Sequence, residues 1–93
     1  MTHTWNITVH LFDADDIMRD GTITTARAVL ATQSGTLLVG HGRARPNPQD
    51  LAVPEIGDEL ATARALRDLA DQLLQATSDD IAEIEHHPVR LPA

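Results

Sequence analysis

The fold is decided by residues 22–45, which read TITTARAVLATQSGTLLVGHGRAR. The first part, Thr22 to Thr32, is rich in β-branched residues and alternates side chains between two faces, as a half-buried strand does. A short turn at residues 33–35 separates it from a second strand, Thr36 to Arg45. Because so short a connection joins antiparallel neighbours, this stretch predicts a β-hairpin.

A further strand is expected before the hairpin, from Thr4 to Phe12. Apolar side chains alternate with polar ones here, beginning with Trp5 and Asn6, and this two-residue period is typical of a strand. A polar connection, Asp13 to Gly21, leads from it into the hairpin. The three strands together predict an antiparallel meander.

A long helix is expected from about Pro54 to Ala76, after two prolines at positions 46 and 48 end the sheet. Apolar residues recur in it at steps of three and four and form one stripe: Ile56, Leu60, Ala63, Leu66, Ala70, Leu73 and Leu74. We expect this stripe to pack against the sheet. Thr77 or Ser78 is expected to cap a second, short helix with Ile81 and Ile84 on its inner face.

The order β-β-β-α-α predicts a single α+β domain over residues 1–93, with a core from about 4 to 87 and an extended tail at 88–93. A three-stranded antiparallel sheet carries one long and one short helix on one face. Gly40, Gly42 and Ala44 would let the long helix lie close to the third strand, because they have little or no side chain. The other face of the sheet has no element left to cover it.

Composition excludes several classes of function. Fourteen acidic residues and seven arginines, with no lysine, give a net charge of −7, which argues against attraction of the whole surface to nucleic acid or anionic lipid. The absence of cysteine excludes disulfides, thiolate metal sites and thiol catalysis. No apolar run is long enough for a membrane span and no signal peptide is recognised, so the expected location is the cytoplasm.

The uncovered face is expected to concentrate basic side chains. Strand alternation places four of them together there, Arg27, His41, Arg43 and Arg45. In one interpretation they are solvated residues that pair with nearby acids. In the other they contact RNA phosphates or acidic groups of a partner. Phe12, Leu37 and Val39 share this face, and their mixture with arginines also fits a homodimer interface.

Other candidate sites are weaker. His86 and His87 lie beside Glu83 and Glu85, but adjacent histidines point in different directions and are expected to be solvated rather than to bind a metal. No nucleophile with a neighbouring base is visible. We therefore expect no catalytic residue, metal site or cofactor, and no binding to DNA or a membrane. On the long helix, Arg64 and Asp68 are expected to form an i,i+4 ion pair.

Several segments resemble a small actinobacterial family of unknown function with a fold like that of double-stranded-RNA-binding domains. The resemblance is carried by residues 39–50, 53–61, 63–66, 68–69 and 77–81, and its most specific part is residues 54–60, PEIGDEL. One mycobacterial member is associated with hypoxia and dormancy, forms a dimer, and has been likened to ribosome hibernation-promoting factors. The resemblance thus implies a non-enzymatic, dimeric stress protein that associates with the ribosome or structured RNA.

Gly57 is the one residue of that segment that a helix disfavours. We expect either a close approach of another backbone there, such as that of a dimer partner, or a helix that begins after Gly57.

Overall fold

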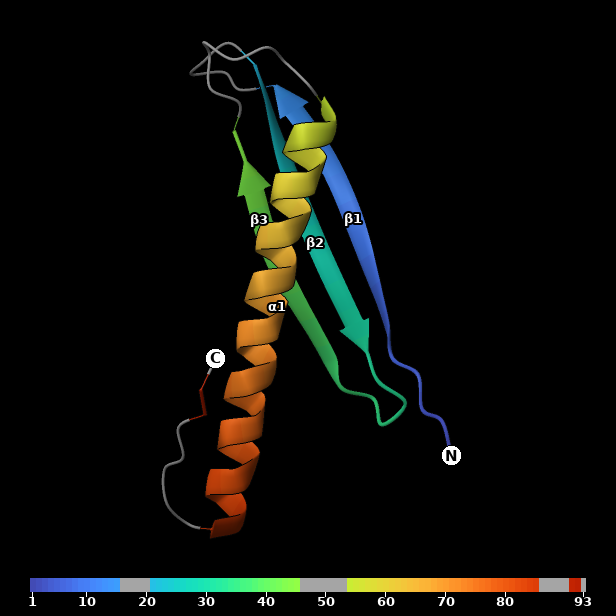
Figure 1. Ribbon diagram of the computed structural model, residues 1–93, viewed down its shortest axis with the longest axis vertical. Helices are drawn as coiled ribbons and strands as arrows, with labels where there is room; N and C mark the ends of the chain where they lie inside the picture. Colours follow the sequence, from blue (N-terminus) through green and yellow to red (C-terminus); the bar gives the residue numbers. More distant parts are fainter. Residues whose placement is uncertain (16–20, 46–53, 86–90, 93) are drawn as a thin grey trace.

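The computed structural model describes residues 1–15, 21–45, 54–85 and 91–92. Three strands, β1 (Asn6–Asp15), β2 (Thr22–Ala31) and β3 (Leu37–Ala44), form one antiparallel sheet in the order β1-β2-β3. A single helix, α1 (Pro54–Glu85), lies across one face of this sheet (Figure 1). The predicted α+β class with a three-stranded antiparallel sheet is confirmed.

The prediction of two helices is wrong, because α1 continues without a break from Pro54 to Glu85. Residues 76–78 contain neither glycine nor proline, so nothing in the backbone ends the helix there. The Thr77 hydroxyl does not cap a new helix but donates to the Leu73 carbonyl, 2.9 Å away and one turn earlier. Ile81 and Ile84 therefore belong to the same long helix.

The first two strands also pair further than expected. β1 runs on to Asp15, and Asp13 lies opposite Thr24, where the Thr24 hydroxyl donates to the Asp13 carboxylate at 2.9 Å. The buried Thr24 side chain thus supplies a hydrogen-bond donor to an acidic residue at the end of β1. The hairpin between β2 and β3 is closed as predicted, by Gly35 at a φ of +90°, a left-handed conformation that suits glycine.

The core is built from small side chains. Its buried members are Ala26, Ala28, Leu30, Ala44, Ala61, Ala65 and Leu69. A methyl group added at Gly40 would lie 2.6 Å from the Leu69 nitrogen, and one added at Gly42 would overlap the backbone of Ala61 and Ala65. The predicted close approach of the helix to the third strand is confirmed.

The predicted inner face of the helix is wrong. α1 presents Ala61, Ala65 and Leu69 to the sheet, whereas Ile56 is 60% exposed and Leu60 and Leu66 are also exposed. A sheet face made of glycine and alanine accepts the closest contact from the smallest side chains of the helix. The larger residues of the first half of the stripe are consequently turned away from the sheet, whereas Leu73 and Leu74 are half-buried and Leu73 packs at the core margin.

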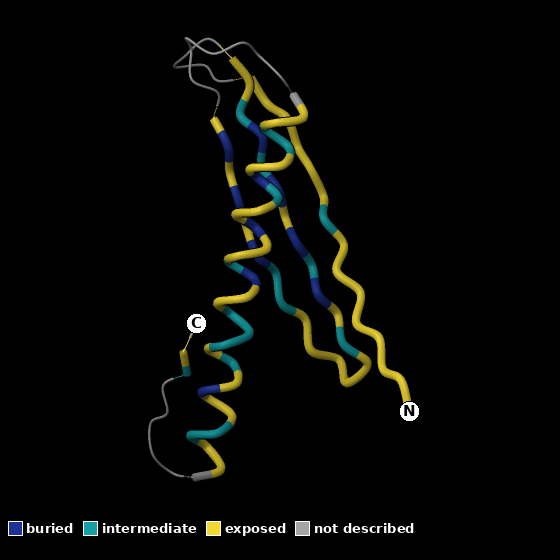
Figure 2. Tube along the Cα trace, in the orientation of Figure 1, coloured by how far each residue is buried: buried dark blue, intermediate teal, exposed yellow. Residues whose placement is uncertain are grey.

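The helix covers the sheet unevenly. α1 packs mainly on β3 and β2 and barely touches β1, and nine of the ten residues of β1 are exposed (Figure 2). With 32 residues, α1 is about 48 Å long. Its C-terminal part therefore continues beyond the hairpin where the eight-residue β3 begins (Figure 1). The chain is correspondingly elongated, with dimensions of 52 × 30 × 19 Å.

Candidate functional site

The candidate site is the open face of the sheet, opposite α1. Cross-strand pairing sets His10, Arg27 and His41 in one row across the three strands. Neighbouring strands are about 4.8 Å apart, so this row is roughly 10 Å wide. Arg43 lies in the next row, opposite Thr25, and Arg45, two residues after Arg43, comes directly after the end of β3.

The basic side chains of this face are free to meet a ligand. Arg27, His41, Arg43 and Arg45 are all exposed, and the structure brings the predicted residues together on one face. The Arg27 guanidinium lies over the Phe12 ring, 5.8 Å from its centroid, which holds the guanidinium near the sheet by a cation–π contact. Their role as ligand-binding residues stays a prediction.

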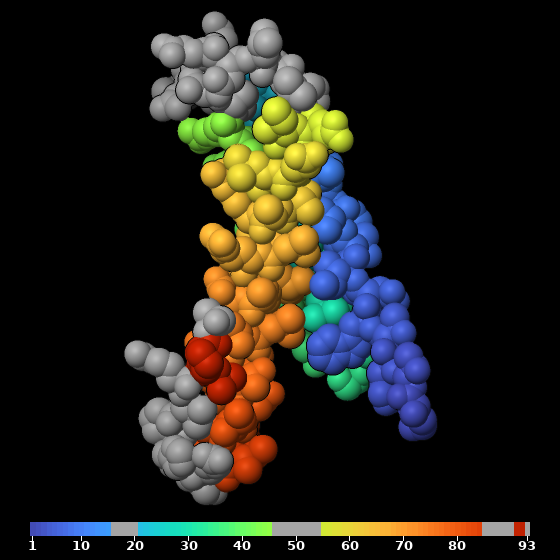
Figure 3. All heavy atoms as spheres, viewed as in Figure 1, coloured from blue at the N-terminus to red at the C-terminus, as the bar shows by residue number. Residues whose placement is uncertain are grey.

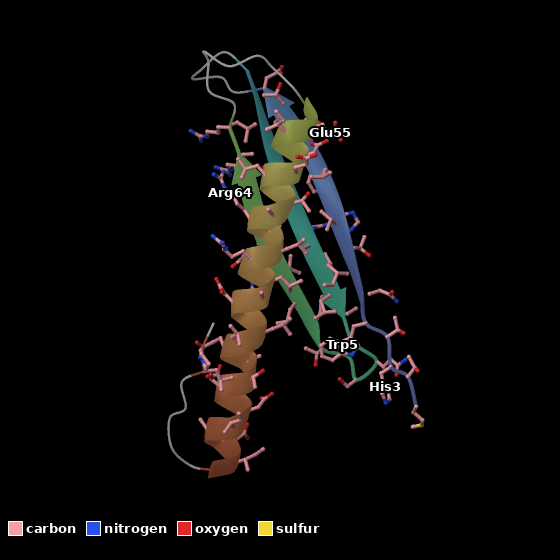
Figure 4. The ribbon with its side chains drawn as sticks, viewed as in Figure 1. His3, Trp5, Glu55 and Arg64 are labelled. Carbon is pink, nitrogen blue, oxygen red and sulfur yellow. The ribbon has the colours of Figure 1, made fainter. Side chains whose placement is uncertain are left out.

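Charge is divided between the two sides of the sheet. None of the described strand residues on the open face is acidic; they are Asn6, Thr8, His10, Phe12, Ala14, Ile23, Thr25, Arg27, Val29, Ala31, Leu37, Val39, His41 and Arg43. Nine of the fourteen acidic residues belong to α1, beginning with Glu55 in its first turn (Figure 4). A protein of net charge −7 therefore has one cationic face.

The apolar residues predicted for a dimer interface share this face. Leu37 is 62% exposed, Phe12 is exposed, and Val39 is half-buried. They lie towards opposite ends of the sheet, since Leu37 begins β3 and Phe12 pairs with Thr25 near the start of β2. The structure thus places them on the open face without gathering them into one patch.

Three polar residues of α1 have a structural role that the sequence analysis missed. The Arg64 guanidinium donates to the Arg43 carbonyl at 2.6 Å, the His41 amide donates to the Asp68 carboxylate at 2.8 Å, and the Gln72 amide donates to the Val39 carbonyl at 2.7 Å. The predicted ion pair of Arg64 with Asp68 is replaced by these contacts with the β3 backbone.

These contacts cover part of the outer edge of β3. Edge strands expose backbone donors and acceptors that can pair with another chain, and here one row of helix side chains, spaced four residues apart, bonds three of those groups. The signal in the sequence was the polar row at positions 64, 68 and 72. Its meaning depends on which flank of α1 lies beside β3, as Figure 4 shows for Arg64.

Gly57 lies inside α1, so the expectation of a helix starting after it is wrong. A methyl group at Gly57 would come 3.1 Å from the Thr24 hydroxyl oxygen. The close approach is made by β2 of the same chain, which explains the glycine without a dimer partner.

Within residues 1–15, 21–45, 54–85 and 91–92, no three histidine or acidic side chains gather as metal ligands, and His86 and His87 lie outside the described residues. The described helix is not apolar enough over a sufficient length to cross a membrane.

The comparisons with known proteins agree with this architecture. A model of the Rv2632c-like family matches residues 3–90. Uncharacterized protein Mb1767 of Mycobacterium bovis is 56% identical over 54 residues, a match that covers 58% of this chain and 57% of the relative, just over half the length of that relative. Uncharacterized protein Rv2632c of Mycobacterium tuberculosis is 53% identical over 66 residues, 71% of this chain and 70% of the relative.

The fold has a solved counterpart. The crystal structure of Rv2632c superposes with a TM-score of 0.78 and 43% sequence identity, covering 95% of this chain and 96% of the other. The curated relatives are named as uncharacterized, so they bring no activity or ligand with them. From the family match and the shared fold, the chain belongs to the Rv2632c-like family.

Proposed function

We propose that this protein binds structured RNA, with the ribosome as the candidate target, through the open face of its sheet. The proposal rests on one observation: Arg27, His41, Arg43 and Arg45 share an exposed face whose described strand residues include no acid, in a protein with a net charge of −7. An acidic protein that binds a polyanion needs its basic residues gathered on one face, away from its acidic residues.

The chemistry of the face favours phosphate contacts over base stacking. Arginine binds phosphate with two parallel hydrogen bonds, and three arginines are available here. Phe12 is the one aromatic side chain among the described residues of this face, whereas single-strand binders use several aromatic platforms. Contacts with the backbone of folded RNA therefore fit the face better than recognition of single-stranded bases.

The wider role belongs to the same proposal. The resemblance, which is most specific in residues 54–60, implies a stress- or dormancy-related protein that binds RNA or the ribosome without catalysis, and the expected location is the cytoplasm. The division of charge supports this role, because the acidic side chains of α1 repel RNA and so favour contact through the open face.

The test is co-sedimentation with purified ribosomes, paired with anisotropy of a labelled RNA hairpin over a range of salt concentrations. About three phosphate contacts should give a slope of roughly −3 for log affinity against log salt. Arg43→Glu with Arg45→Glu should weaken binding by about tenfold or more and reduce the slope by about 2. The fold should survive, because both side chains are exposed.

Arg67→Glu provides the matched control. It reverses the charge of one arginine, as each of the two open-face substitutions does, at an exposed position of α1 on the other side of the sheet. It is compared with Arg43→Glu alone, and it should leave RNA affinity within about twofold of the wild type. Equal binding by the wild type and the Arg43/Arg45 double variant, or equal losses from Arg67→Glu, would remove the open face from the proposal.

The second candidate is a homodimeric protein-interaction module that binds no nucleic acid. Exposure of Phe12 and Leu37 on the open face favours it, since two copies could pair through these side chains. Leu37→Glu would then dissociate the dimer, and neither ribosomes nor RNA would bind at low salt.

A further inference from the structure

The open face carries two histidines beside its arginines. His10 of β1 and His41 of β3 lie on either side of Arg27, in the row that crosses the three strands. All three side chains are exposed. Histidine is the residue type whose charge ordinarily changes between about pH 5 and pH 8. The row therefore has a fixed positive charge at its centre and a variable charge at each end.

The charged groups around His41 come from the sheet and from α1. On the sheet they are Arg27, directly opposite, and Arg43, two residues further along β3. From α1, the Asp68 carboxylate accepts from the His41 amide at 2.8 Å, and the Arg64 guanidinium donates to the Arg43 carbonyl at 2.6 Å. Both α1 groups bond the backbone at the edge of β3, so the imidazole has two arginines beside it on the open face.

His10 has simpler surroundings. Its neighbours on the same face of β1 are Thr8 and Phe12, and α1 barely touches β1. Among the residues that the structure describes, Arg27 is therefore the charged group that faces His10. A positive charge on either histidine adds to that of Arg27, and like charges on cross-strand neighbours about 5 Å apart repel one another.

A bound phosphate removes this repulsion. A protonated imidazole donates from both ring nitrogens and forms charge-assisted hydrogen bonds with phosphate oxygens. The row of three side chains is roughly 10 Å wide, so it suits a chain of phosphates that crosses the strands better than a single ion. Arg43 lies about 7 Å further along β3, beside the path of such a chain.

Most acidic side chains are kept apart from this row. Figure 3 looks onto the α1 side of the molecule, where the helix lies over the sheet, and nine of the fourteen acidic residues belong to α1. The row lies on the opposite face, so the sheet separates it from most of these acids. Protonation of the two histidines therefore strengthens a positive field that already exists on the open face.

We propose that His10, Arg27 and His41 form a proton-linked site for a chain of phosphate groups, such as the backbone of RNA, that lies across the three strands. The inference rests on the proposed RNA binding and deepens it, because it adds His10 to the contacts and makes the affinity depend on pH. Phosphodiesters stay ionised over the range in which histidine titrates. By linkage, RNA binds more tightly as the pH falls, and binding takes up protons.

Anisotropy of a labelled RNA hairpin at about pH 8 and pH 5.5 tests the proposal. For the wild type, affinity should rise about tenfold or more at the lower pH, and the slope of log affinity against log salt should change from roughly −3 to roughly −5, because two contacts are added. His10→Gln with His41→Gln should abolish this rise, since glutamine can donate a hydrogen bond but carries no charge. His10→Arg with His41→Arg should bind tightly at both pH values.

His3→Gln is the matched control. His3 is exposed and lies before β1, outside the row (Figure 4), so this variant should keep the full pH response. Far-UV circular dichroism at both pH values checks that each variant keeps the fold, which is expected because the substituted side chains are exposed.

Calorimetry gives an independent readout of the protons. Titration of RNA near pH 6.5, in two buffers with different ionisation enthalpies, should show uptake of on the order of one proton by the wild type and by His3→Gln. The variant with His10→Gln and His41→Gln should take up almost none.

The outcomes separate this proposal from RNA binding itself. Equal RNA affinity at both pH values, or a pH response that persists in the double glutamine variant, would overturn the proton-linked site and leave RNA binding in place. Long-chain inorganic polyphosphate is the second probe, because it offers phosphates without sugar or base. If it binds with the same pH response and the hairpin does not bind, the site stands and RNA fails as its ligand. If neither polyanion binds at either pH, both proposals fail.

Discussion

Gly40→Ala measures how closely α1 must approach β3. The added methyl carbon would lie 2.6 Å from the Leu69 nitrogen and 2.8 Å from the Leu69 Cβ, and would overlap the Ala65 carbonyl oxygen. Two of these three atoms are backbone atoms, so no rotation of a side chain relieves the contact. The helix has to move outward by about 1 Å to restore ordinary van der Waals distances.

The cost follows from the packing that this movement loosens. Overpacking in a tight core destabilises a protein by about 1–3 kcal/mol, while replacing glycine with alanine recovers about 0.4–1 kcal/mol from the unfolded chain. The displacement also stretches the hydrogen bonds that hold α1 on the edge of β3, between Asp68 and His41 and between Gln72 and Val39. We expect a net loss of about 2 kcal/mol in the free energy of unfolding.

Thermal unfolding followed by circular dichroism is the assay. For a domain of this size, about 2 kcal/mol corresponds to a fall in Tm of roughly 8–16 °C. Wild type and variant should be compared at several concentrations, so that any change in association is separated from a change in the fold. A Tm within about 2 °C of the wild type would show that the helix does not depend on this close approach.

Three further substitutions test other parts of the fold by urea unfolding. Leu69→Ala should lower the free energy of unfolding by about 2–5 kcal/mol, since Leu69 is one of the two largest fully buried side chains; a loss below about 1 kcal/mol would contradict the core described above. Asp68→Ala should lower it by about 1 kcal/mol and increase aggregation measured by light scattering, because the His41 amide loses its acceptor at the sheet edge; unchanged scattering would argue against edge protection. Gly57→Ala should change it by less than about 1 kcal/mol, because a better helix former offsets a 3.1 Å contact with the Thr24 hydroxyl, which a small movement relieves; a loss of about 2 kcal/mol or more would show that Thr24 cannot move.

The strands and their facing follow from local patterns. Alternation in Thr22 to Arg45 and the glycine turn between the strands are sufficient to place Arg27, His41 and Arg43 on one face, because successive side chains of a strand point to opposite sides. The close approach of a helix to Gly40 and Gly42 is also visible in the sequence, since no other residue type leaves that space.

The face of α1 that packs on the sheet does not follow from local patterns. Helical periodicity shows that several faces of residues 54–85 are apolar, and it predicts burial of the face with the larger residues. Tertiary packing selected Ala61, Ala65 and Leu69 instead, because contact between a glycine-lined strand and a helix is closest where both surfaces are small. The continuity of the helix through Thr77 was likewise decided by a local hydrogen bond that competes with a cap.

The candidate site also has one part that the sequence predicts and another that depends on tertiary packing. The cationic face arises from side-chain alternation, which is a property of the strand alone. The role of Arg64, Asp68 and Gln72 at the edge of β3 depends on how α1 is rotated about its axis. The exposure of larger apolar side chains of α1, such as Ile56 and Leu60, depends on the same rotation. That rotation is set by contacts between residues more than twenty positions apart in the chain, such as Gly40 with Ala65, and a local pattern contains no information about them.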